Sequence, residues 1–263
     1  MLSGGTTFEK AGINRSIVEG VLEPALAERL LSRGGQEPIR FFAAGMSLVI
    51  HPRSPMIPTV HLNVRYLELG SLDGRPEDVW FGGGTDLTPT YPFPEDALHF
   101  HRALQGICAR YHPRFYPEFK AWCDRYFSNA HRGGEARGIG GLFFDHLRPD
   151  DERFALGVDD LFRFADAIGR SLAEAYMPIV DRRRQLPYGD RERRFQLQRR
   201  GRYVEFNLLH DRGTVFGLQT GGRVESILMS LPPRVRWVYD HRPEPGSAEA
   251  RLLAVLGAPR DWA

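Results

Sequence analysis

Residues 47–66 read SLVIHPRSPMIPTVHLNVRY, and this stretch decides the fold. It is typical of two short strands that are joined by a proline-rich loop, residues 52–59. The prolines leave this loop few conformations to lose on folding. Because successive side chains of a strand point to opposite faces, we expect Ser47 and His51 on one face of the first strand.

The same alternation places three polar side chains on one face of the second strand: His61, Asn63 and Arg65. If the two strands pair, all five hydrogen-bonding side chains converge on one patch of the sheet. This patch has two interpretations, the lining of a site or a plain solvated sheet face, and the spacing alone leaves both open.

The whole chain has 263 residues, which is enough for one large domain with a sizeable core. Hydrophobic residues make up 42% and charged residues 26%, as is ordinary for a globular protein. Helical and strand segments alternate without a regular βαβ period, and there is no internal repeat or linker. We therefore expect a single α+β domain, residues 1–263, with a mostly antiparallel sheet covered by helices.

Composition also excludes several classes of protein. A net charge of +2 does not require a nucleic-acid or membrane partner, and no apolar run is long enough for a transmembrane helix. The first residues lack the regions of a signal peptide, and Cys108 and Cys123 are too few for a disulfide framework, so we expect a cytoplasmic location. Two thiols cannot hold an iron–sulfur cluster, and the glycine clusters lack the dinucleotide fingerprint of NAD or flavin proteins.

Around the opening stretch, the pattern predicts further elements. The segment from Phe8 is expected to be extended and then to turn, and Gly82–Gly84 are expected to end a strand in a turn just before Asp86. We expect helices at 23–31, 94–111, 117–130, 159–180 and 248–256, a buried strand at 137–147, and a hairpin of strands 202–209 and 214–220.

Other candidate residues have ordinary alternatives. Asp86 is also typical of a turn or cap carboxylate, His101 of a satisfied core histidine, and His131 of a partner for a helix C-terminus. The arginines between 182 and 202 are compatible with a nucleic-acid patch or a surface for an acidic small molecule. Their acidic neighbours favour a solvated helix face.

Several long motifs resemble one family. GMSLVIHPRSPMIPTVHLNVRYLE (45–68), WFGGGTDLTPTYPFPEDALHFHR (80–102), HRGGEARGIGGLFFDHL (131–147) and residues 188–241 are similar to the oxygen-dependent coproporphyrinogen III oxidases. The resemblance runs from about Phe8 onward, and family members usually carry some tens of residues before that point. It implies a large flat antiparallel sheet sandwiched between helices on both faces, in a homodimer. It also implies oxidative decarboxylation of two propionates of coproporphyrinogen III to vinyl groups, giving protoporphyrinogen IX, with O2 as the oxidant.

The resemblance also implies residue roles. Its substrate-binding positions are Ser47, Asn63, Val64, Arg65, Gly221, Gly222 and Arg223. His61 is the implied proton donor, Asp86 an acidic residue of the site, and Asp211 a second acidic residue with a weaker case. The implied metal ligands are His51, His61, His101 and His131, and the dimer interface is implied at Tyr203 to Val238.

An acidic substrate agrees with the residues themselves. Burying an unpaired carboxylate is prohibitive, so a pocket for several propionates needs guanidinium and backbone donors, which Arg65, Arg223 and the nearby glycines can supply. The electron-rich substrate can reduce O2 itself, so we expect no flavin, NAD or haem.

A divalent metal is an expectation with an alternative. The four histidines come from segments whose convergence cannot be read from spacing, and the sequence slightly favours the alternative of four separate hydrogen-bonding roles. Two rival functions stay open: a metal-dependent oxygenase or hydrolase for another acidic substrate, and a binding module for tetrapyrrole or RNA.

Overall fold

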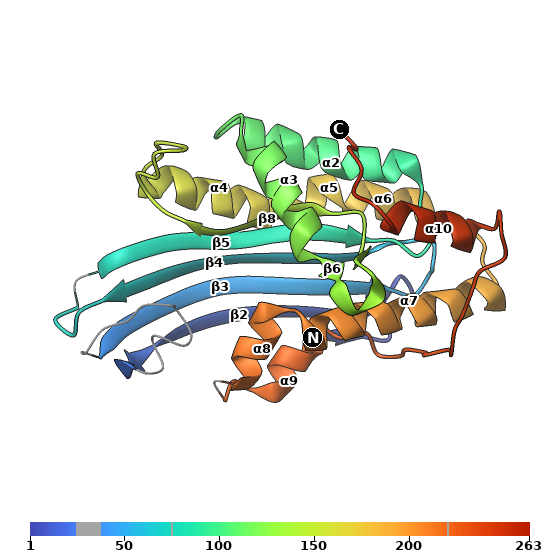
Figure 1. The fold of residues 1–263 in the computed structure, drawn as a ribbon, viewed down its shortest axis with the longest axis horizontal. Helices are drawn as coiled ribbons and strands as arrows, with labels where there is room; N and C mark the ends of the chain where they lie inside the picture. Colours follow the sequence, from blue (N-terminus) through green and yellow to red (C-terminus); the bar gives the residue numbers. More distant parts are fainter. Residues whose placement is uncertain (25–37, 75, 220) are drawn as a thin grey trace.

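One antiparallel sheet organises the computed structural model, which describes residues 1–24, 38–74, 76–219 and 221–263. Six strands follow the order β1-β2-β3-β4-β5-β8 (Figure 1). This confirms the predicted α+β class with its large antiparallel sheet. The strands are β1 (Leu2–Ser3), β2 (Phe8–Leu22), β3 (Ile39–Pro52), β4 (Thr59–Gly70), β5 (Pro76–Thr88) and β8 (Gly141–Leu147), while β6 (Ser128–Asn129) and β7 (Glu135–Ala136) form a separate pair.

The register confirms the polar patch predicted from residues 47–66. Ser47 on β3 lies opposite Asn63 on β4, and Val49 lies opposite His61. On the next strand, Asp86 lies opposite His61. Since directly opposite residues of neighbouring strands point to the same face, these side chains share one face of the sheet.

The other face of the sheet builds the main core. Val60 and Leu62 on β4 are completely buried there, together with Phe100, Leu104 and Phe164 from the covering helices. These helices come from the middle of the chain and lie on one side of the strands in Figure 1. They are α2 (Pro94–Ala109), α3 (Phe115–Tyr126), α4 (Val158–Arg170), α5 (Leu172–Ala175) and α6 (Met177–Arg183).

The later part of the chain covers the polar face. It forms α7 (Asp190–Leu209), α8 (Arg212–Gln219), α9 (Val224–Ile227) and the 3-10 turn η2 (Leu228–Ser230), and α10 (Ala248–Leu256) follows as predicted. The predicted hairpin at 202–209 and 214–220 is therefore wrong for the described residues. Several buried positions of α7 are polar, including Gln196, Arg200 and Asn207, so the helical spacing does not stand out as an apolar stripe.

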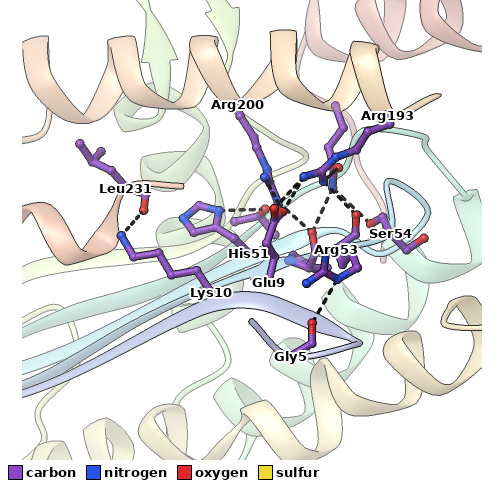
Figure 2. A network of polar contacts seen from close by, with 12 residues as sticks. Gly5, Glu9, Lys10, His51, Arg53, Ser54, Arg193, Arg200 and Leu231 are labelled. Carbon is purple, nitrogen blue, oxygen red and sulfur yellow. Dashed lines mark hydrogen bonds and ion pairs between the residues drawn. The ribbon is translucent and has the colours of Figure 1, made fainter. Parts of the chain in front are cut away.

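A buried ionic network fastens α7 to the sheet. Arg193 and Arg200 both donate to the carboxylate of Glu9 on β2, at 2.8 Å, and Arg200 also donates to the carbonyl of Pro52 (Figure 2). Burial alone would raise the pKa of Glu9, but the two guanidinium groups outweigh it and hold that pKa below its usual range. Arg193 and Arg200 of the basic run are thus partners of the sheet, whereas the buried Arg199 pairs with Glu135 of β7.

Two other sequence predictions need correction. Gly82–Gly84 and Asp86 lie inside β5, with no turn between them. Glycine is required there by close approach, because a Cβ on Gly84 would lie 2.2 Å from the backbone carbonyl oxygen of Leu142. The expected turn after Phe8 is likewise continuous strand.

The expected helix 159–180 is divided into α4, α5 and α6. Pro178 occupies the first turn of α6, where proline fits, but its missing N–H cannot continue a helix from the previous turn. Most of the helix expected at 23–31 lies outside the described residues. Among the described residues, no helix has the length and apolar character needed to cross a membrane.

Candidate functional site

A cavity of about 220 Å³ lies between the polar face of the sheet and the segment that runs from α7 to η2. Strands β2, β3 and β4 form its floor, and the chain from Asn207 to Ser230 forms its walls. The lining combines hydrogen-bonding groups with a few apolar side chains. It consists of Gly12, Asn14, Ser47, Leu48, Val49, His61, Asn63, Asn207, Asp211, Gly213, Thr214, Ser226, Ile227, Met229 and Ser230.

A row of three polar residues crosses the floor of this cavity. Asn14 lies opposite Ser47, and Ser47 lies opposite Asn63, so the row spans β2, β3 and β4. The structure therefore places Ser47 and Asn63, two of the predicted substrate residues, in one cavity with His61. Amide and hydroxyl groups in such a row can both donate and accept hydrogen bonds.

His61 is held by a carboxylate from the neighbouring strand. Its Nδ1 lies 2.8 Å from Oδ1 of Asp86, and the same oxygen accepts from Nη2 of Arg137 at 2.6 Å. Asp86 and Arg137 each have side chains that are 1% exposed, whereas His61 is 22% exposed toward the cavity. Asp86 thus supports His61 from behind, and it does not line the cavity.

The groups around Asp86 keep its carboxyl ionised. Burial alone would raise the pKa of the Asp86 carboxyl, but the charge of Arg137 and the hydrogen bond from His61 outweigh burial and hold that pKa below its usual range. Arg137 is also surrounded by aromatic rings, with its guanidinium carbon 3.9 Å from the ring centre of Phe127. An ionised Asp86 accepts the Nδ1–H of His61, which leaves Nε2 as the nitrogen free for proton exchange in the cavity.

Asp211 brings a carboxylate directly into the lining. Its Oδ2 accepts from the backbone N–H and the hydroxyl of Thr214, and its Oδ1 accepts from the hydroxyl of Tyr126. These contacts fix Asp211 just before α8. Among the described residues that line the cavity, it is the only carboxylate.

The predicted substrate residues do not all reach the cavity. Arg65 follows Asn63 on the same face of β4, and its Nη2 lies 2.9 Å from Oδ2 of Asp145. Val64 points to the opposite face, where it packs against the main core. Arg65 therefore lies beside the cavity lining, whereas the Val64 side chain is a core contact.

The Gly221–Arg223 triplet lies away from the cavity lining. The Arg223 side chain is 79% exposed, and its Nε is 3.8 Å from a carboxylate oxygen of Glu225. Gly221 has a φ of +72°, and Gly222 donates its backbone N–H to the carbonyl of Gly217. In this structure the triplet forms the connection between α8 and α9.

The four histidines that the resemblance implies as metal ligands have separate partners. His51 Nε2 lies 2.8 Å from the carbonyl of Ser230, and both ring nitrogens of the buried His101 are hydrogen-bonded, to Tyr116 and to Ile139. His131 contacts His210 and Glu205.

These contacts do not fit a shared metal site. Burial lowers the pKa of His51 to about 3 and that of His101 to about 4, so both rings are neutral, with Nε2–H donating to a carbonyl. In the part of the chain that the structure describes, no group of three or more His, Cys, Asp or Glu residues is arranged to hold a metal ion. Metal binding therefore stays a prediction.

Sequence reasoning missed Arg137, Asn14 and Asn207. Arg137 ends the polar segment HRGGEAR (131–137), whose composition is typical of an exposed loop. Only its buried ion pair with Asp86 shows that it supports the site. Asn14 could have been found, because β2 continues the alternation of Gly12 and Ser16 on the cavity side. Asn207 was assigned to a strand, which placed it on the wrong element.

Comparison with known proteins places the chain in one family. The family model described as coproporphyrinogen III oxidase matches residues 1–262. A protein from Glycine max, named oxygen-dependent coproporphyrinogen-III oxidase, chloroplastic, is 48% identical over 268 aligned residues, which cover 100% of this chain and 68% of that protein.

Proposed function

The chain belongs to the coproporphyrinogen III oxidase family, and we propose that it decarboxylates coproporphyrinogen III oxidatively to protoporphyrinogen IX at the cavity around His61. The observation that carries this proposal is a histidine held by a buried Asp86–Arg137 pair and facing a cavity with a polar floor. This arrangement supplies proton transfer and hydrogen bonding next to the macrocycle.

The reaction balances for each propionate. A –CH2–CH2–COO⁻ side chain becomes –CH=CH2 and CO2, and O2 with one proton takes up the remaining hydrogen and two electrons as H2O2. The electron-rich pyrrole system supplies the electrons, so the protein must bind the substrate, orient it and move protons. Two such reactions convert the two propionates to vinyl groups.

His61 is the residue that we assign to proton transfer. With Nδ1–H donated to Asp86, Nε2 can take a proton from a pyrrole N–H and return it later to reduced oxygen. Asp211 is the carboxylate that can accept a hydrogen bond from the pyrrole N–H groups, because it lines the same cavity. Asp86, behind His61, orients the imidazole and balances its charge when it is protonated.

Arg65 is the residue that we assign to a propionate. It lies next to Asn63 on the cavity side of β4 and is held there by Asp145. A guanidinium group can bind a carboxylate through two parallel hydrogen bonds. Ser47 and Asn63 add neutral donors on the floor, and Arg223 would have to move toward the cavity to join them.

Three further properties are proposals that the family suggests. These are a homodimer with an interface at Tyr203 to Val238, a cytoplasmic location, and a divalent metal. Tyr203 itself is buried within the protomer against Arg137, so the exposed part of that range would form the interface. Mass measurement in solution and metal analysis of the purified protein test the first and last.

The direct test is an activity assay. Coproporphyrinogen III prepared without air is mixed with the protein and then exposed to O2, and protoporphyrin and CO2 are measured. We expect two molecules of CO2 for each protoporphyrin and no product without O2. A protein that binds the porphyrinogen without releasing CO2 would instead be a tetrapyrrole carrier.

A further inference from the structure

Two neighbouring side chains of the sheet bind two consecutive carbonyls of the cavity wall. Lys10 on β2 and His51 on β3 lie opposite each other in the strand register. Lys10 Nζ donates to the carbonyl of Leu231 at 2.7 Å, and His51 Nε2 lies 2.8 Å from the carbonyl of Ser230. Figure 2 shows both side chains beside the Glu9 network, with Lys10 reaching Leu231.

These carbonyls belong to the wall of the cavity. Met229 and Ser230 line it, and Leu231 follows directly. Gly12, on the same face of β2 as Lys10, lets the wall approach the floor, because a Cβ there would lie 2.5 Å from Cγ of Met229. Lys10, Gly12 and His51 thus set the distance between the cavity wall and the sheet.

Besides these contacts, the described residues give His51 one long contact, between its Nδ1 and the Thr59 hydroxyl at 3.5 Å. His51 is 1% exposed and its ring packs edge-on against Tyr203, so it cannot reach the substrate. The described residues give Lys10 a single hydrogen bond, to Leu231, and no ion pair. Burial lowers the pKa of Lys10, which is the effect expected of a cation that lacks a carboxylate partner.

We propose that Lys10 and His51 are positioning residues, which fasten the Met229–Leu231 wall to the sheet and so set the shape of the substrate cavity. This proposal rests on the proposed function. It gives His51 a hydrogen-bond donor role, in place of the metal-ligand role that the family resemblance implies. Loss of either donor loosens the wall, which weakens substrate binding while His61 and its support stay intact.

The kinetic test uses Lys10→Met, His51→Ala and His51→Gln. We expect the KM for coproporphyrinogen III to rise about three- to tenfold in Lys10→Met and His51→Ala, the effect of one lost hydrogen bond, with kcat within about twofold. His51→Gln keeps an N–H donor and is expected to restore KM to within about twofold.

Matched controls come from α2 and α3. His99 also hydrogen-bonds a backbone carbonyl, that of Glu174, and Lys120 donates to the carbonyl of Arg260, both outside the cavity lining. His99→Ala and Lys120→Met are expected to leave KM unchanged. If His51→Ala raises KM no more than His99→Ala does, or if His51→Gln is as impaired as His51→Ala, the proposal is overturned.

A second measurement does not depend on turnover. Amide hydrogen exchange over residues 224–231 is expected to speed up in Lys10→Met and in His51→Ala, while exchange in α4 stays as in the wild type. Unchanged exchange at 224–231 in both variants overturns the proposal. An inactive wild-type protein would refute the proposed function instead, and the exchange experiment would still decide the role of Lys10 and His51.

Discussion

His61 and Asp86 lie directly opposite each other on β4 and β5, and their side chains meet at 2.8 Å. Antiparallel register alone brings them together, although they are 25 residues apart in sequence. Arg137 then reaches the same carboxylate oxygen from the connection that precedes β8. The pairing of β4 with β5 therefore fixes the position of His61 relative to Asp86.

Replacing His61 tests the proton-transfer group. His61→Ala should lower kcat by about 10²- to 10⁴-fold, the usual contribution of a general acid–base group. The free energy of unfolding should change little, because Asp86 keeps its pairing with Arg137. Steady-state kinetics and urea unfolding measure both effects, and a His61→Ala enzyme with wild-type kcat would exclude His61 from the chemistry.

Replacing Asp86 should affect both activity and stability. Asp86→Ala leaves Arg137 buried without its carboxylate, which typically costs about 3–5 kcal/mol of unfolding free energy. The double variant Asp86→Asn with Arg137→Met removes both charges and should be the more stable of the two, while staying poorly active. If the two variants have equal free energies of unfolding, the unpaired charge of Arg137 is not the cause of the instability.

Replacing Arg65 tests the carboxylate contact. Arg65→Ala should raise the KM for coproporphyrinogen III about 10- to 100-fold, which corresponds to one charge-assisted hydrogen-bonded pair. Arg148→Ala is the matched control, because Arg148 pairs with Asp78 near the same sheet and is not part of the cavity lining. Similar KM values for the two variants would remove Arg65 from substrate binding.

The Gly12–Met229 contact predicts a compensating pair. Gly12→Ala should push Met229 into the cavity, since the new Cβ would lie 2.5 Å from Cγ of Met229, and should raise KM several-fold. Adding Met229→Ala makes room and should return KM toward the wild-type value. A Gly12→Ala enzyme with wild-type KM would show that the wall shifts without consequence for substrate binding.

Glu205 predicts how stability depends on pH. Burial raises the pKa of Glu205, but hydrogen bonds from Arg132 and His131 outweigh it and lower the pKa to about 2. Because the folded pKa lies below the unfolded value of 4.5, the stabilisation is complete above about pH 4.5 and is lost as pH falls toward about 2.

Glu205→Gln should therefore reduce stability at pH 7 and flatten its decline between these two pH values. Thermal unfolding measured across that range gives the comparison. A variant with the wild-type slope would mean that other carboxylates dominate acid unfolding.

Alternation in the opening stretch predicted the polar face, and the strand register bears it out. The helix at 248–256 was also predicted with the bounds it has. These elements have clear local patterns. By contrast, α7 buries Gln196 and Arg200 against sheet partners, and its local pattern cannot reveal partners that are distant in sequence.

The site was predictable where it follows strand alternation. Ser47, His61 and Asn63 meet in the cavity as the spacing suggests, whereas the support of His61 by Arg137 depends on long-range folding. The sequence predicts a turn at the glycines of β5, because glycine is typical both of turns and of strand positions that pack closely against a neighbour. The separate partners of His51, His101 and His131 agree with the alternative of separate hydrogen-bonding roles, and His101 is the satisfied core histidine that its sequence position predicts.

The most direct test of the central claim compares wild type with His61→Ala in the aerobic assay. CO2 release and protoporphyrin are followed from anaerobically prepared coproporphyrinogen III, with substrate binding measured separately in the absence of O2. We predict that wild type releases two CO2 for each protoporphyrin, and that His61→Ala binds the porphyrinogen but turns it over at least about 100-fold more slowly. Equal turnover by the two proteins, or no CO2 from wild type, would contradict the account.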